Sequence, residues 1–292
     1  MCNALRAKAR VNSETVTVFE NGPTFYRITT DHFVMFVTDE DADHQEDFAA
    51  AAEASLKACQ QILPASPRTS PSKSFVAYIV SNPVHARAIT QMRLGADAPE
   101  MKIERGGYTV DAYILALGSD RTAQITILSH EIFHATLGRH VAVRPPAFLE
   151  EGIASMFERV TFDSRKATVD RSFNAMRGQQ LAKLIDDGPG LLPLKEMVTL
   201  DAGQIMTRRP DQASTFYSQA WALAMFLDAQ PGPAGSALRS LLADAVAGAG
   251  PFADDAKKRD ARAIVEHYAG GSLESIEPAY RRFVADRLAY RR

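Results

Sequence analysis

The sequence predicts an α+β protein with a small mixed β-sheet in the first half of the chain and a mostly helical second half. Before residue 120, short runs rich in β-branched and aromatic residues alternate with helix-type segments. After residue 145, apolar residues recur at helical spacing between proline and glycine breakers. The 292 residues are 46% hydrophobic and 23% charged, which is typical of a globular protein with a packed core.

Composition excludes several classes of protein. A net charge of -2 provides no basic field for binding nucleic acid. No apolar run approaches the roughly 20 residues that a membrane-spanning helix needs. The two cysteines, Cys2 and Cys59, have neither metal-type spacing nor the pattern of a disulfide framework. We expect Cys59 in the core or on a helix face.

The first half predicts alternating strands and helices. Residues 15–38 have the β-branched and aromatic content of strands, whereas the Ala-rich segment that follows has apolar positions at helical spacing. Asn82-Pro83 is typical of a helix start. The expected elements are strands within 15–38, a helix over 43–63, a strand over 75–80, a short helix to about residue 94 and a strand over 108–117.

The next predicted helix, over about 122–137, contains the pattern His-Glu-x-x-His at His130, Glu131 and His134. Residues four apart lie on the same face of a helix, so both histidines can bind one metal ion. Glu131 is then next to the position where a water molecule would bind. We expect Gly138 to end this helix.

A catalytic zinc site usually has three protein ligands and one open position, and two residues are candidates for the third ligand. His140 comes ten residues after His130, the spacing of the third histidine in metzincins, but Leu137 stands where that pattern has glycine. Glu151 follows His134 after sixteen residues, enough for a loop and a returning helix.

We favour Glu151, with His140 as the alternative. The helix that carries Glu151 is expected to begin near Pro145-Pro146, because proline suits the first helical turn. Glu150 would point about 100° away from Glu151 on that helix and is therefore not an equal ligand.

Residues 130–137, 146–154 and 217–227 together resemble the gluzincin (thermolysin-like, MA clan) metallopeptidases, and look most like the small bacterial peptidase-MA-like proteins. The likeness is most specific in the first two segments. The chain has no Gly-x-Met-Glu-Asn motif of the large aminopeptidases. It also has Ser155 where thermolysin places an Asp four residues after its ligand Glu.

The resemblance implies a zincin-like fold and a Zn²⁺ ion bound by His130, His134 and Glu151. It implies peptide hydrolysis by a metal-activated water, with Glu131 as the general base. Tyr217 is the candidate donor to the oxyanion, and its alternative is an aromatic core residue. Tyr108 and His140 are the other candidate donors. Small residues after Glu151 are expected to let the helices pack closely around the ion, namely Gly152, Ala154 and Ser155.

Two other functions stay open: a non-catalytic zincin-like binding module, and a metal hydrolase that acts on a non-peptide substrate. The expected partner is a peptide or protein substrate, held along 108–117 if that strand lies at a sheet edge. An interior strand is the alternative. No nucleic-acid partner and no transmembrane segment are expected.

The expected organisation is an N-terminal lead (1–22), a zincin-like α+β subdomain with the metal ligands (23–162) and a helical subdomain that closes the cleft (163–292). The sequence as given shows no hydrophobic export signal, so we expect a cytoplasmic protein. Removal of a signal peptide would instead place it in the bacterial cell envelope or outside the cell.

Overall fold

The computed structural model describes residues 12–18, 22–68, 74–95, 106–164, 166–188, 190–200, 205, 212–253 and 260–290. The expected lead over 1–22 lies outside these residues except for 12–18 and residue 22, and Cys2 lies outside them too. The protein is a mixed α/β structure whose contacts divide it into two compact units. Unit 1 comprises Met1–Lys57, Ser70–Ala135 and Val160–Val169, and unit 2 comprises Ala58–Thr69, Thr136–Arg159 and Asp170–Arg292.

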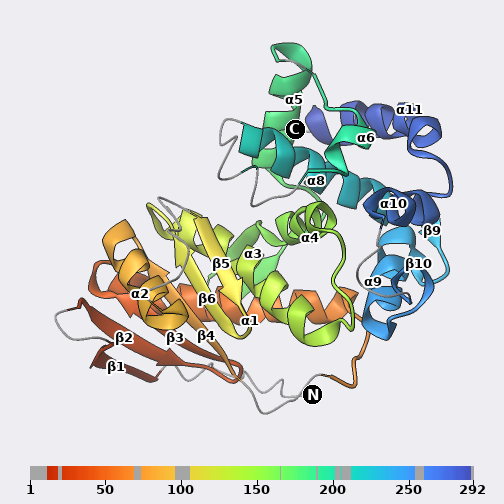
Figure 1. The fold of residues 1–292 in the computed structure, drawn as a ribbon. Helices are drawn as coiled ribbons and strands as arrows, with labels where there is room; N and C mark the ends of the chain where they lie inside the picture. Colours follow the sequence, from red (N-terminus) through yellow and green to blue (C-terminus); the bar gives the residue numbers. More distant parts are fainter. Residues whose placement is uncertain are drawn as a thin grey trace, which may run out of the picture. The chain divides into compact units, whose positions relative to one another are not determined.

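Unit 1 contains a six-stranded mixed sheet in the order β1-β2-β3-β4-β6-β5 (Figure 1). Neighbouring strands are parallel from β3 through β4 to β6, and antiparallel in the pairs β1-β2, β2-β3 and β5-β6. The strands are β1 (Asn12–Thr17), β2 (Thr24–Thr29), β3 (Phe33–Thr38), β4 (Phe75–Val80), β5 (Gly106–Val110) and β6 (Tyr113–Leu117).

Helices cover both faces of this sheet (Figure 1). On one face, α2 (Pro83–Leu94) packs Ala86 and Ile89 into a core cluster that includes Tyr78 and Leu115 of the sheet. The other face carries α3 (Arg121–His140) and the 3-10 helix Asp39–His44 that leads into α1 (Gln45–Ile62). There the Ser55 hydroxyl donates to Ser129 Oγ at 2.8 Å, which joins α1 to α3.

Local sequence accounts for the starts of α2 and α3. The Asn82 side chain accepts a hydrogen bond from the Val84 amide at 2.8 Å, and Pro83 occupies the first turn. Asp120 Oδ1 accepts from the Ala123 amide at 3.0 Å. The predictions of a strand over 75–80 and of a helix from Pro83 to about residue 94 are confirmed.

The prediction of one strand over 108–117 is wrong, because these residues belong to the hairpin of β5 and β6. Val110 pairs with Tyr113, so Asp111 and Ala112 form a two-residue turn. Asp111 has a φ of 54°, a left-handed conformation that Asp tolerates better than most residues. The turn was missed because it contains no glycine or proline.

The predicted end of the motif helix is also wrong, since α3 continues past Gly138 to His140. Gly138 is not among the glycines with positive φ, so it does not form the left-handed cap that was expected. His140 therefore stays on the same helix as His130 and His134.

Unit 2 confirms the mostly helical second half over the residues that the structure describes. An unexpected hairpin of β7 (Val160–Asp163) and β8 (Lys166–Val169) belongs to unit 1. Within the described ranges, every helix is too short or too polar to cross a membrane. The longer helices of unit 2 are α4 (Ala147–Ala154), α5 (Ala175–Asp186), α8 (Ala213–Ala229), α9 (Ala237–Ala247), α10 (Ala261–Ala269) and α11 (Leu273–Phe283). Its shorter elements are the 3-10 helices Ser155–Phe157 and Gly250–Phe252, α6 (Leu194–Met197), β9 (Pro231–Gly232), β10 (Gly235–Ser236) and the π-helix Val284–Ala289.

Candidate metal centre

The two motif histidines lie one turn apart on α3, with their ring planes tilted by 56° to each other. Their Nε2 atoms are 3.1 Å apart and their ring centres 4.9 Å apart. Both side chains are buried, at 9% exposure each. Two nitrogen ligands of a tetrahedral zinc ion, each about 2.0–2.1 Å from the metal, stand about 3.3 Å apart. The His130–His134 geometry therefore fits one zinc ion.

Glu151 on α4 completes a group of three. One ligand atom each from His130, His134 and Glu151 lie within 4.8 Å of one another. Two histidines and one glutamate form a donor set of known catalytic zinc sites.

Glu150, the neighbour of Glu151, has a different partner. Arg144 Nη1 donates to Glu150 Oε1 at 2.8 Å, and the Glu150 carboxylate is buried. The Arg144 guanidinium also lies over Gly138, 2.7 Å from the point where a Cβ would stand. The absence of a side chain at Gly138 thus lets Arg144 lie against the last turns of α3 while it pairs with Glu150.

His140 is not part of the group. It is six residues beyond His134 on an unbroken helix, about 9 Å further along the axis. Its Nδ1 lies 2.8 Å from the Thr136 carbonyl oxygen, and burial lowers the pKa of its imidazole. The metzincin arrangement would require α3 to end before His140.

Glu131 is buried, with 7% exposure, and contacts β5. Thr109 Oγ1 lies 2.9 Å from Glu131 Oε2. Thr109 was not among the residues that the sequence indicated. The available signal was the alternation of side chains between the two faces of the strand that directly precedes the motif helix. The single strand expected over 108–117 did not indicate that Thr109 lies beside Glu131.

The two tyrosines proposed as oxyanion donors have different surroundings. Tyr108 donates to Thr90 Oγ1 of α2 at 3.1 Å, and burial raises the pKa of its phenol. Because successive side chains of a strand point to opposite faces, Tyr108 lies on the sheet face opposite Thr109 and Glu131. It is therefore wrongly placed to act with Glu131.

Tyr217 lies on α8 beside a buried ion pair of unit 2. The Arg177 guanidinium carbon is 5.3 Å from the Tyr217 ring centre, and the same guanidinium makes two hydrogen bonds to Glu158, of 2.6 and 3.0 Å. The Asn174 amide donates to the same carboxylate at 2.7 Å. Tyr217 is half-buried, unlike the fully buried Phe216. Its role as an oxyanion donor stays a prediction.

Gly152, next to Glu151, allows close approach of α4 to α8. A Cβ at Gly152 would overlap the Ala220 carbonyl oxygen and stand 2.5 Å from the Ala220 carbonyl carbon. The small size of Gly152 thus permits the close contact with α8, which the sequence did not predict. Ser155, one turn further on, is buried, and its hydroxyl has no hydrogen-bond partner among the described residues.

Replacing Gly152 with alanine should destabilise the protein by about 1–3 kcal/mol, because the methyl group meets backbone that cannot rotate away. Gly138→Ala is the matched control within a helix. There the neighbour is the end of the flexible Arg144 side chain, so we expect a change below about 1 kcal/mol. Urea denaturation of both variants measures the difference. Equal stability of the two variants would contradict the α4–α8 contact.

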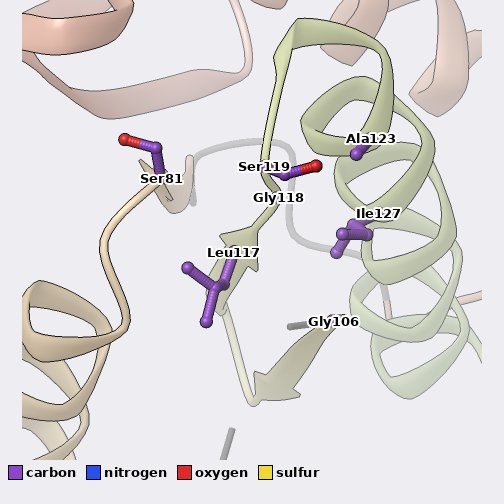
Figure 2. A pocket seen from close by; sticks show the side chains of 7 residues that line it. All are labelled: Ser81, Gly106, Leu117, Gly118, Ser119, Ala123 and Ile127. Carbon is purple, nitrogen blue, oxygen red and sulfur yellow. The ribbon is translucent and has the colours of Figure 1, made fainter. Parts of the chain in front are cut away.

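A pocket of about 410 Å³ opens beside α3 within unit 1. Figure 2 shows it between the ends of β4 and β6 and the first turns of α3. Leu117 and Ile127 supply its apolar surface, and Ser81 and Ser119 its hydroxyl groups. Ile127, which lines the pocket, lies one turn before Glu131 on α3.

Comparison with models of known protein families and with curated proteins finds no match for this chain.

Proposed function

We propose that this protein is a zinc-dependent metallopeptidase with a zincin-like catalytic unit. The observation that carries the proposal is the group of His130, His134 and Glu151, whose ligand atoms lie within 4.8 Å of one another. The buried Glu131 directly follows one of these ligands. A site that serves only structure has no need of a general base at that position, so Glu131 favours catalysis over a structural metal.

A bound zinc ion and two side chains of this protein would share the chemical roles. A zinc ion held by the three residues supplies a Lewis acid, which makes water more acidic and polarises a carbonyl group. Glu131 takes a proton from the attacking water and passes it to the leaving amine. Tyr217 donates a hydrogen bond to the developing oxyanion. Hydrolysis of a peptide bond needs these three roles: a Lewis acid, a general base and a donor to the oxyanion.

The substrate we propose is an extended peptide bound along β5. Among the described residues, β5 pairs with β6 alone, and a sheet edge of this kind can pair with an added strand. The pocket at the start of α3, which Gly106 of β5 also lines, would receive one substrate side chain. Its lining residues are uncharged, which favours a small or apolar side chain over a charged one.

The test is hydrolysis of an unstructured protein, such as casein, by the zinc-loaded protein. We expect new peptide fragments in a mass spectrum, their loss when a chelator is added and their return when zinc is restored. Absence of fragments with zinc bound would reject the peptidase proposal in favour of a binding module. Cleavage of esters alone would indicate a hydrolase of non-peptide substrates.

A further inference from the structure

Strand β5 lies directly against α3 at Glu131. A Cβ at Gly107 would overlap the Leu115 carbonyl oxygen and stand 2.8 Å from Glu131 Cγ and 2.7 Å from Ile127 Cγ2. Since two of these contacts are with side chains of α3, the missing side chain at Gly107 is what lets β5 come so close. The methylene groups of Glu131 therefore lie against the strand backbone.

Thr109 lies two residues after Gly107 and so faces the same side of the sheet. Its Oγ1 is 2.9 Å from Glu131 Oε2 and 3.0 Å from the Glu131 carbonyl oxygen. The single hydroxyl proton can be donated to one of these acceptors at a time, and an ionised carboxylate is the stronger acceptor. A carboxylate that is only 7% exposed needs such a donor, because water contributes little there.

The terminal torsion of a glutamate side chain is broad, so packing of its methylene groups leaves the carboxylate plane undefined. A hydrogen bond to one oxygen fixes that plane, and with it the direction of the other oxygen. Gly107 thus restricts the stem of Glu131 by contact, and Thr109 orients its carboxylate by a hydrogen bond.

We propose that Thr109 is the positioning residue that orients Glu131 for proton transfer. This inference rests on the proposed function, in which Glu131 is the general base. Because Thr109 lies on the strand that we propose to bind the peptide, one element both holds the substrate and orients the base. Removal of the hydroxyl leaves the backbone of β5 unchanged, so substrate binding should persist while turnover falls.

The experiment compares Thr109→Val, which keeps the shape and removes the hydroxyl, with Thr109→Ser, which keeps the hydroxyl. Thr29→Val, at an exposed position of β2, is the control for a Thr-to-Val change in a strand. We expect Thr109→Val to lower kcat by about 10–100-fold with KM and zinc content unchanged. Thr109→Ser should restore most of the activity, and Thr29→Val should match the wild type.

A second readout needs no activity. In protein labelled with ¹³C at glutamate carboxyl groups, the Glu131 resonance is identified by its loss in Glu131→Gln. We expect that resonance to shift in Thr109→Val and to return towards its wild-type position in Thr109→Ser. An unshifted resonance in Thr109→Val overturns the inference, and so does an unchanged kcat. If the wild type hydrolyses no peptide, the proposed function fails, and the resonance alone decides whether Thr109 orients Glu131.

Discussion

Replacing Glu131 with glutamine is expected to keep the zinc content of the protein and to lower kcat for peptide hydrolysis by about 10²–10⁴-fold, the usual contribution of a general acid–base group. Glutamine has nearly the same shape as glutamate, and its amide oxygen can still accept the Thr109 hydrogen bond. The buried side chain should therefore stay in place. What is lost is the ability to take a proton from water.

The measurement is zinc content by elemental mass spectrometry beside initial rates of peptide cleavage. Glu53→Gln, which makes the same change on α1 at an acid that accepts from Thr30 and His32, serves as the control and should cleave at the wild-type rate. Undiminished hydrolysis by Glu131→Gln would refute its role as base. Loss of zinc from that variant would make Glu131 a metal ligand instead.

Replacing Glu151 with alanine should weaken zinc binding by more than about 100-fold. Loss of a residue that merely supports a ligand already costs about 10–100-fold in metal affinity, and Glu151 is a ligand in the proposed site. Only two histidines would remain, and catalytic zinc sites normally have three protein ligands.

His140→Ala is the matched comparison, because His140 was the alternative third ligand. It should retain about one zinc ion per chain, since α3 continues unbroken and carries His140 away from His130 and His134. Competition with a coloured chelator gives the affinities of wild type and both variants. Zinc loss in His140→Ala with retention in Glu151→Ala would reverse the assignment. A wild type that binds no zinc would remove the basis of the enzyme proposal.

Much of the fold was predictable because its signals are local. The strand over 75–80 is a continuous apolar run, and the start of α2 follows from Asn82 and Pro83, which act on their own helix. The errors lie where the local signal is weak or ambiguous. Gly138 is typical of a helix end, but α3 continues through it to His140. The hairpin over 106–117 depends on a turn at Asp111 that carries no strong sequence signal.

The sequence by itself determined that His130 and His134 face the same way and that Glu131 adjoins them, because helix geometry relates residues one and four apart. The sequence favoured Glu151 over His140 as the third residue of the group, but only the tertiary structure shows that α3 continues unbroken to His140 and that Glu151 lies near both histidines. It alone also revealed Thr109 beside Glu131. These two residues are 22 positions apart and meet through the register of β5 with β6 and the packing of α3 on the sheet, which no local pattern specifies.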